Sequence, residues 1–315
     1  MKYFILGGAG FIGSNLLARL FEEEKDFEAI VFDNLSSGKM EYISDFINTK
    51  NCRFINDDIK NLESLINSMK GVDIVYHFAS NPDISKAVKQ PDIDFWEGTY
   101  LTNNILEAMR TNGVKKLLYA SGSGVYGEVG MNKVKEDYSP MLPISTYGAS
   151  KLGCEALICS YSCMFGIDAV AFRFANVVGP NQTHGVAYDF IRKLKQTSSQ
   201  LEILGDGTQD KSYIYVSDVI DAMRLVEKKY LNDFNYFNVA TEDSITVKQI
   251  ADIVVNLMGL KDVKYIYSGG SRGWKGDVPK IYLDSTKIRK LGWKNKFNSH
   301  EAIMRSVREM LEKSA

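Results

Sequence analysis

The chain has few of the residues that bind metals or form disulfides. Only four of its 315 residues are cysteine and three are histidine. They are Cys52, Cys154, Cys159 and Cys163, and His77, His184 and His300. The cysteines lack CxxC spacing, three of them fall in one helical segment, and the histidines are scattered. We therefore expect no metal site, and thiols that are buried or free in a reducing cytoplasm.

Net charge and long apolar runs are also missing. The 38 basic and 39 acidic residues leave a net charge of −1, so no global field would recruit nucleic acid. No apolar run approaches the roughly 18 residues that cross a bilayer, and Met1 leads directly into a short apolar run without a signal peptide. With 45% hydrophobic residues the chain can still bury a sizeable core. We expect a cytoplasmic protein with neither nucleic-acid nor membrane partners.

The start of the chain carries a glycine pattern. The apolar run Lys2 to Leu6 predicts a buried parallel strand, and Gly7, Gly10 and Gly13 follow it before a helical pattern begins. Glycines at this spacing provide a tight turn, let the backbone approach a pyrophosphate, and pack helix closely on strand. The helix N-terminus then offers free N–H groups to the phosphates. The alternative is a glycine-rich turn that binds nothing.

Asp33 makes that alternative the weaker one. It ends a second apolar run, residues 29–32, twenty residues after Gly13. A carboxylate at this place accepts hydrogen bonds from the two adenosine-ribose hydroxyls of NAD. It would repel a 2′-phosphate, and no arginine follows it immediately. The sequence therefore predicts NAD rather than NADP as the cofactor.

Tyr147 and Lys151 form a second candidate site. Residues four apart on a helix share a face, about one turn apart. A lysine ammonium beside a phenol favours the phenolate, so that the tyrosine can act as an acid or base near neutral pH. Oxidation of a carbinol needs such a group to take the hydroxyl proton. Alone, this spacing also occurs on solvated helix faces.

Strand and helix signals alternate to about residue 180, which predicts an α/β fold with a Rossmann-type, doubly wound parallel sheet. Further strands are expected at 53–55, 74–79, 116–121 and 169–173, with helices at 101–112 and 149–165. Beyond Pro180 the pattern turns irregular. There we expect helices near 187–196, 246–258 and 300–313, a turn at 205–207 and a strand at 213–216. This part would be a smaller C-terminal α/β unit.

With these residues in hand, the chain resembles the extended short-chain dehydrogenase/reductase family, in its NAD-dependent sugar-nucleotide epimerase/dehydratase branch. The likeness runs nearly end to end. Besides Gly7-x-x-Gly10-x-x-Gly13 and Tyr147-x-x-x-Lys151, its marks are Asp33-Asn34-Leu35-Ser36-Ser37-Gly38, Asp58-Ile59, His77-Phe78-Ala79, Val125-Tyr126-Gly127, Arg173-Phe174-Ala175-Asn176 and Gly205-Asp206-Gly207-Thr208. The closest pattern is that of the UDP-glucose (UDP-galactose) 4-epimerases, and residues 272–278 look like the archaeal type.

The resemblance implies a role for each matched residue. The implied NAD-binding residues are Gly7, Gly10, Phe11, Ile12, Gly13, Asp33, Asn34, Ser36, Ser37, Gly38, Asp58, Ile59, Phe78, Ala79, Ser80, Ser121, Tyr147 and Lys151. The implied substrate-binding residues are Ser123, Tyr147, Asn176, Gly185, Val186, Lys211 and Arg272. Residues 1–180 would be the NAD-binding domain and 181–315 the nucleotide-sugar-binding domain, interleaved, with an approximate boundary. Relatives often pair through the helices at 101–112 and 149–165, so a homodimer is expected.

Within these roles, Asp58 would bond the adenine amino group and Ile59 would pack on the ring. Tyr147 would be the acid/base, and Lys151 would lower its pKa and hold the nicotinamide ribose. Asn176, Lys211 and Arg272 would meet the diphosphate, which needs several cationic or N–H donors. Most relatives have arginine in place of Lys211, and lysine lacks the bidentate fork. The alternative for Lys211 and Arg272 is a solvated surface charge.

Two positions depart from the family pattern. The family usually places a catalytic Ser or Thr three residues before Val125, where this chain has Gly122. Glycines on both sides of Ser123 leave its backbone free to re-aim, so we take Ser123 as the substitute. The alternative is that neither Ser121 nor Ser123 reaches the substrate. The second departure is Gly98, where relatives usually have asparagine and where one cofactor-side hydrogen bond is expected to be missing.

Missing residues also separate the activities within the family. The 4,6-dehydratases carry an Asp-Glu pair just before Val-Tyr-Gly, and the decarboxylases typically carry a glutamate there, whereas this chain has Ser123 and Gly124. We therefore expect a catalytic set of Tyr147, Lys151 and Ser123 that epimerises C4 of a UDP-hexose through a 4-keto intermediate. The alternatives are a dehydrogenase or ketoreductase on another nucleotide sugar, and a catalytically weak NAD-binding regulatory protein.

Overall fold

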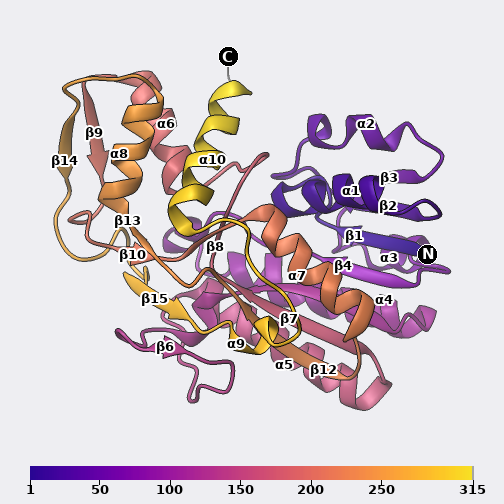
Figure 1. The fold of residues 1–315 in the computed structure, drawn as a ribbon. Coiled ribbons are helices and arrows are strands. Elements are labelled where there is room, and N and C mark those ends of the chain that lie inside the picture. The colour runs from indigo at the N-terminus through magenta and orange to yellow at the C-terminus, as the bar shows by residue number, and fades with distance from the viewer. Residues whose placement is uncertain (314–315) are drawn as a thin grey trace.

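A seven-stranded parallel sheet forms the centre of the molecule (Figure 1). The computed structural model describes residues 1–313. The strand order is β12-β7-β5-β4-β1-β2-β3, and every neighbouring pair is parallel. The strands are β1 (Lys2–Leu6), β2 (Glu28–Asp33), β3 (Cys52–Asn56), β4 (Ile74–His77), β5 (Lys116–Gly122), β7 (Asp168–Phe174) and β12 (Phe234–Val239). The expected α/β, Rossmann-type fold class is confirmed.

Helices cover both faces of this sheet because successive side chains of a strand point to opposite faces. Tyr3 and Ile5 of β1 join the core on one side, under α1 (Phe11–Glu23) and α7 (Val216–Lys229). Phe4 and Leu6 point the other way. On that second side lie α3 (Leu62–Ser68), α4 (Tyr100–Asn112) and α5 (Thr146–Phe165), and the short α2 (Ser44–Ile47) lies beside α1.

The order of the strands fixes where a ligand can enter. The chain runs from β1 outward to β2 and β3, then returns to the other side of β1 with β4 and β5. In such sheets ligands bind outside the carboxyl ends of the strands, at the point where the order reverses. Gly7, Asp33, Phe78 and Ser121 all lie at these ends.

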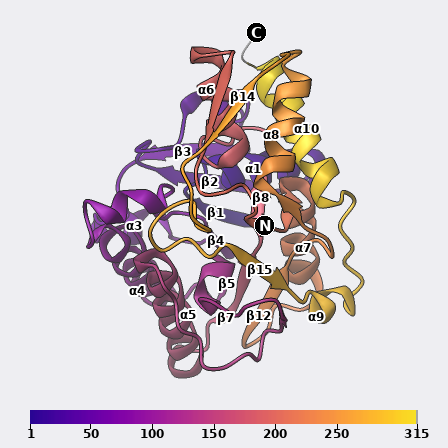
Figure 2. The ribbon, with the colours of Figure 1, turned by 90° about the vertical axis from the view of Figure 1, so that its left-hand side faces the viewer.

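A smaller part with several short sheets follows the central one (Figures 1 and 2). A four-stranded sheet has the order β13-β10-β15-β6, and two parallel pairs are β11-β8 and β14-β9. Its strands are β6 (Lys133–Val134), β8 (Asn176–Val178), β9 (Gln200–Ile203), β10 (Asp210–Lys211), β11 (Tyr213–Tyr215), β13 (Ile245–Thr246), β14 (Lys264–Tyr267) and β15 (Lys280–Leu283). Its helices are α6 (Val186–Gln196), α8 (Val247–Leu257), α9 (Thr286–Arg289) and α10 (Ser299–Glu312).

Several elements were not expected from the sequence, and two of them, α7 and β12, belong to the central part of the fold. Strand β11 ends at Tyr215, and Val216 begins helix α7, whereas we expected a strand through Val216. Strand β12 pairs with β7 from Phe234↔Ala169 to Val239↔Phe174, so a late segment completes the central sheet. Conversely, β6 belongs to the first part of the chain by sequence but pairs with β15 of the smaller part.

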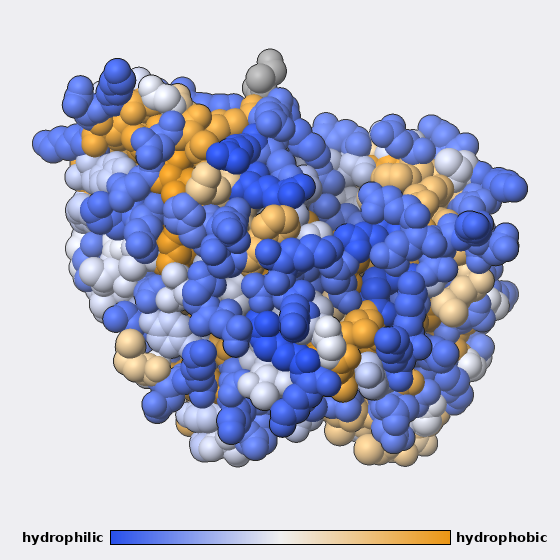
Figure 3. Space-filling view, viewed as in Figure 1, coloured by the Kyte–Doolittle hydropathy of each residue, from blue (hydrophilic) through white to orange (hydrophobic). Residues whose placement is uncertain are grey.

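The surface seen in Figure 3 is mostly hydrophilic, with apolar residues in separate groups. No helix within residues 1–313 is long and apolar enough to cross a membrane. In the same range no group of three or more His, Cys, Asp or Glu side chains could hold a metal ion. All four cysteines are free thiols, as expected; Cys52 and Cys154 are buried and Cys163 is exposed.

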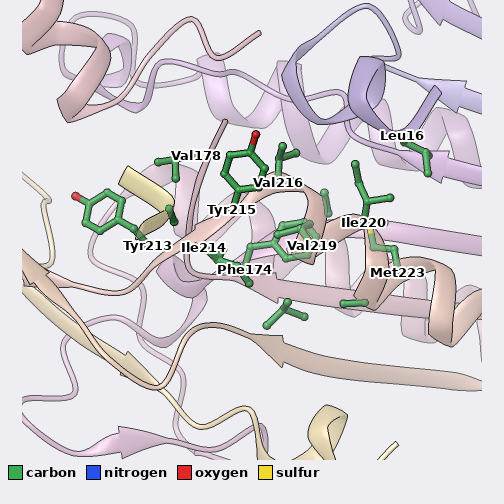
Figure 4. Close-up of a cluster of buried hydrophobic side chains, with 14 of the residues drawn as sticks. Leu16, Phe174, Val178, Tyr213, Ile214, Tyr215, Val216, Val219, Ile220 and Met223 are labelled. Carbon is green, nitrogen blue, oxygen red and sulfur yellow. The ribbon is translucent and has the colours of Figure 1, made fainter. Parts of the chain in front are cut away.

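One continuous core joins the two parts of the chain. Figure 4 shows Leu16 of α1 and Val219, Ile220 and Met223 of α7 beside the β8–β11 pair. Each of these side chains is at most 2% exposed. Burial of one such side chain contributes about 1.5–3 kcal/mol. The shared core holds β8 and β11, which carry Asn176 at one end, rigidly against the central sheet.

Candidate active site

The glycine turn leaves no room for side chains. Gly7 has φ +71°, and a Cβ there would lie 2.8 Å from the backbone nitrogen of Ala79. A Cβ on Gly13 would lie 2.4 Å from the Gly7 carbonyl oxygen. No side chain caps α1, so the first N–H groups of this helix, at Phe11 and Ile12, stay open to a ligand. A dinucleotide pyrophosphate suits such a cradle of N–H groups.

Asp33 forms the wall next to this turn. Its Oδ2 accepts from the backbone N–H of Ala9 at 3.0 Å and its Oδ1 from that of Leu35 at 2.8 Å. The side chain is buried, and burial raises the pKa of its carboxyl while the two backbone donors oppose that shift. Each carboxylate oxygen accepts one protein donor, which leaves a lone pair on each for a ribose hydroxyl.

The residues after Asp33 fold back over the turn. Asn34 accepts from Ser36 N–H at 3.0 Å and donates to Asp58 Oδ2 at 2.9 Å. Ser37 follows, and a Cβ on Gly38 would lie 2.9 Å from the Ala9 carbonyl carbon. The structure thus brings the two expected cofactor segments, 33–38 and 58–59, together.

Ile59 and Phe78, two further residues expected to bind NAD, are held in place by the hydrophobic core. Ile59 is 6% exposed and packs within the α3–α4 side of the core. Phe78 donates its N–H to Leu6 O at 2.9 Å, and its ring stacks on Tyr76. Ala79 and Ser80 continue past the glycine turn, where Ala79 touches Gly7.

The expected helical turn brings Tyr147 and Lys151 together. Ser145 caps α5 by accepting from Gly148 N–H at 3.1 Å, and this places Tyr147 in the first turn. Lys151 Nζ lies 5.5 Å from the centre of the Tyr147 ring and donates to Ala120 O at 2.8 Å. Lys151 is 5% exposed. Its ammonium has three N–H donors, so two remain for hydroxyl groups of ligands.

His77 lies behind this lysine as a neutral ring. Burial and the positive charge of Lys151 hold the pKa of the imidazole well below its usual value. Nε2 lies 3.0 Å from Thr102 Oγ1, while Nδ1 is buried without a hydrogen-bond partner among residues 1–313. The ring therefore packs beside Lys151 without competing for its N–H donors.

The two serines around Gly122 have different surroundings. Ser121 donates to Glu155 Oε1 at 2.5 Å, and Glu155 pairs with the buried Arg173 at 2.7 Å. No hydrogen bond ties the Ser123 hydroxyl to any residue of the described range, and this side chain is partly exposed. Gly122 is extended, with φ −160°, and a Cβ on it would meet nothing within 4 Å. The space of the missing side chain is therefore open.

Apart from Ser123 and Tyr147, the expected substrate residues lie on the smaller part and its loops. Asn176 Nδ2 donates to Ser212 O at 3.2 Å, which ties it to the residue directly before β11. Gly185, with φ +101°, precedes Val186 at the start of α6. Lys211 Nζ lies 2.6 Å from Asp277 Oδ1.

Arg272 reaches the same place from a loop. It donates to the Asp277 carbonyl oxygen at 2.6 Å and pairs with Glu128. No role was expected for Asp277 or Glu128 from the sequence. Asp277 lies within the 272–278 segment that resembles the archaeal type, and Glu128 directly follows Val125-Tyr126-Gly127. Both residues are therefore adjacent to family motifs in the sequence. Their partners lie 66 and 144 residues away, which no local pattern reveals.

A surface cavity of about 350 Å³ lies away from Tyr147, between α5 and β12. Glu136, Glu155, Arg173 and Tyr236 are among its lining residues. It backs onto the Ser121–Glu155–Arg173 chain of contacts, so it lies behind β5 rather than at the carboxyl ends of the strands. We assign it no part in the site.

Seven parallel strands in this order, with a glycine turn at the switch point, define a Rossmann-type, dinucleotide-binding enzyme. Residues 3–240 match the model of the NAD dependent epimerase/dehydratase family, and the chain belongs to that family. NAD is its cofactor, and its activity is that of a nucleotide-sugar epimerase or dehydratase. The open glycine turn and buried Asp33 fit this dinucleotide.

Individual relatives are similar over the whole chain. A Methanocaldococcus jannaschii protein, itself only provisionally named a UDP-glucose 4-epimerase, is 35% identical over 313 residues and 97% of each chain. The crystal structure of a UDP-galactose 4-epimerase is 36% identical, with a TM-score of 0.88 and 99% of both chains covered. The Thermotoga maritima UDP-glucose 4-epimerase, solved with UDP-glucose, is 31% identical, with a TM-score of 0.89 and 100% of both chains covered.

Proposed function

We propose that the protein epimerises C4 of a UDP-hexose of the UDP-glucose/UDP-galactose type. One observation carries the proposal: Lys151 Nζ lies beside the Tyr147 ring at the carboxyl end of β5, where the Ser123 hydroxyl is unpaired within the described chain. Bound NAD supplies the acceptance and return of hydride. The similar solved structures of UDP-galactose and UDP-glucose 4-epimerases support this substrate class.

The proposed catalytic residues handle the proton. Tyr147 takes the C4 hydroxyl proton as the carbinol becomes a ketone and gives it back when the alcohol re-forms. Lys151 supplies positive charge beside the phenol and has N–H donors left for ribose hydroxyls. Ser123 donates to the sugar oxygen in place of the hydroxyl that Gly122 lacks.

The proposed substrate residues hold the diphosphate and nucleotide. Arg272 contributes a cation, and Asn176, Gly185 and Val186 contribute polar and backbone contacts. The pairing of Lys211 with Asp277 gives the lysine a second role, since it neutralises a nearly buried carboxylate that would repel the diphosphate. The sugar itself turns between Tyr147 and this anchored end.

We further propose that the two parts of the chain bind different ligands. Residues 1–180 bind NAD and 181–315 bind the nucleotide sugar, with β12 as the late segment of the first part. We propose a homodimer through α4 and α5, since Met164 of α5 and Phe95, in the turn that leads into α4, are exposed apolar side chains. The free thiols support a cytoplasmic location.

The test is a substrate panel with a matched variant. UDP-glucose, UDP-galactose, their N-acetyl forms and UDP-glucuronate are incubated with the wild type and with Tyr147→Phe. We expect interconversion of one C4 pair and a loss of kcat in the variant of about 10²- to 10⁴-fold, without loss of bound NAD. No conversion of any of these sugars would refute the proposal, and NADH released with each turnover would instead indicate a dehydrogenase.

Gly122 gives that test a second arm. A Cβ fits there, so Gly122→Ser adds a hydroxyl to open space without a steric cost. If Ser123 is the acting hydroxyl, Ser123→Ala lowers kcat and the double variant Gly122→Ser, Ser123→Ala recovers it. An unaffected Ser123→Ala would remove Ser123 from the catalytic set.

A further inference from the structure

Asp94 is a buried carboxylate beside the site, and it has no cationic partner among residues 1–313. It precedes the π-helical turn η3 (Phe95–Thr99) and is 2% exposed. Across residues 1–313, no Lys, Arg or His lies within ion-pair distance of it. A buried charge is costly unless several donors satisfy it. Its donors therefore show what this charge holds in place.

Those donors come from two different segments of the site. Thr146 Oγ1 donates to Asp94 Oδ2 at 2.7 Å, and Thr146 is the residue before Tyr147. Asn81 Nδ2 donates to Asp94 Oδ1 at 2.9 Å, and Asn81 follows the cofactor segment 78–80. One carboxylate thus joins the catalytic turn to the cofactor loop.

A third contact tightens the helix side. Ser150 Oγ donates to the Asp94 carbonyl oxygen at 2.6 Å and lies 2.9 Å from Thr99 Oγ1. Ser150 is the residue before Lys151. A Cβ on Gly98 would lie 2.3 Å from Ser150 Oγ. Gly98, where relatives usually have asparagine, is therefore the position that lets η3 close onto α5.

The loop side is equally constrained. Asn81 Nδ2 also donates to Asp83 O at 2.9 Å, and Asn81 Oδ1 accepts from Asp83 N–H at 3.1 Å. Asn81 is 4% exposed. The amide thus locks its own turn and fastens that turn to Asp94.

We propose that Asp94 is a positioning residue that fixes the Tyr147–Lys151 turn relative to the loop lining the NAD site. The expected effect on turnover rests on the proposed function, whereas the expected effect on NAD binding does not. A positioning error of about 1 Å can cost 10²-fold in rate, so two hydrogen bonds that set this spacing bear directly on turnover. Asp94 itself touches neither substrate nor cofactor in this account.

The hydrogen bonds of Asp94 to α5 (the helix arm, through Thr146) and to the loop after β4 (the loop arm, through Asn81) can be removed separately. Thr146→Val replaces a hydroxyl with a methyl of similar shape and removes the hydrogen bond from α5 to the Asp94 carboxylate, whereas Thr146→Ser keeps that hydrogen bond. We expect Thr146→Val to lower kcat about 10-fold with little change in KM, and Thr146→Ser to stay within about 2-fold of the wild type. A general loss of stability would instead lower the folded fraction of both variants alike.

The loop arm has a readout that needs no turnover. Asn81→Ala is expected to release bound NAD about 10-fold faster, measured as NAD retained after gel filtration. Asp92→Ala is the matched control. Asp92 lies two residues from Asp94, and its carboxylate accepts from Trp96 Nε1 at 3.1 Å instead of reaching the loop or α5. This control should retain NAD and activity as the wild type does.

The outcomes separate this inference from the proposed function. Equal kcat in Thr146→Val and Thr146→Ser, or equal NAD retention in Asn81→Ala and Asp92→Ala, overturns the role of Asp94. A wild type that converts none of the sugars overturns the proposed function, and the NAD-release comparison then decides on Asp94 by itself.

Discussion

The residues that we propose to bind NAD, the cofactor side, and those that we propose to bind the nucleotide sugar, the substrate side, are held in place in different ways. On the cofactor side, backbone atoms meet backbone atoms, and the one key carboxylate, Asp33, is held by two backbone N–H groups. On the substrate side, the cations Lys211 and Arg272 are held by side-chain carboxylates. The first arrangement allows little movement. The second allows partners to exchange, because a diphosphate can replace a carboxylate.

The largest effect should come from breaking the backbone-built side. Gly13→Val places a side chain 2.4 Å or less from the Gly7 carbonyl oxygen, which forces the turn open. We expect a loss of about 1–3 kcal/mol in the free energy of unfolding and a more than 10-fold loss of retained NAD. Urea unfolding and NAD content measure the two.

The matched control for that change is Gly153→Ala. Its Cβ would meet only Thr99 atoms, at 3.9 Å and beyond, inside helix α5. It should retain NAD and gain up to about 1 kcal/mol in stability, since alanine favours a helix over glycine. If Gly13→Val behaved like this control, the cofactor side would be less rigid than described.

A smaller effect should follow on the substrate side. Asp277→Asn removes the partner of Lys211, whose side chain is 19% exposed. We expect a loss of about 1–3 kcal/mol in stability, with NAD retention unchanged, and a decrease of about 3-fold in KM because a carboxylate that repels the diphosphate is removed. Glu242→Gln, which alters a 3.8 Å pair on a 74% exposed glutamate, is the control and should change neither. Loss of NAD in Asp277→Asn would contradict the separation of the two sides.

His77 should make the free energy of unfolding depend on pH. Its folded-state pKa is well below the value of about 6.5 that it has when unfolded, so below that pH the unfolded chain binds a proton that the folded chain does not. The His77 contribution to stability therefore falls as pH drops, by about 1.4 kcal/mol per unit. His77→Gln should lose this component, with His300→Gln as the control, in urea unfolding near pH 7, 6 and 5. An identical slope in wild type and His77→Gln would show that the ring titrates normally.

The smallest effect is expected at Glu128. Its pair with Arg272 is 47% and 40% exposed, and such pairs contribute at most about 1 kcal/mol. Glu128→Gln frees Arg272 for the diphosphate, so KM should fall about 2- to 3-fold at low salt, and less at high salt. An increase in KM would mean that Glu128 helps to bind the substrate.

The comparison also explains what the sequence could reveal. The β1–α1–β2 unit follows from apolar runs, glycine spacing and one acidic residue, all within about 33 residues of each other. Helix α7 was missed although Val219, Met223 and Val226 have helical spacing, because the apolar residues before Val216 favoured a strand. Strand β12 pairs with a partner some 65 residues earlier, for which no local signal exists.

The same limit applies to the site. Tyr147 and Lys151 lie one turn apart, so their proximity follows from spacing in the sequence. Asp94 joins Asn81 and Thr146 across 13 and 52 residues, and its importance appears only once the loop and helix are placed in space. Contacts between distant side chains, rather than backbone patterns, are what the sequence did not reveal.

The most direct test of the central claim follows hydrogen at C4. The wild type is incubated with UDP-galactose in D₂O and the products are followed by NMR. The account predicts UDP-glucose that retains its original hydrogen at C4, since the hydride would pass to bound NAD and return from it without exchange with water. Deuterium at C4, or no conversion of the sugar, would contradict it.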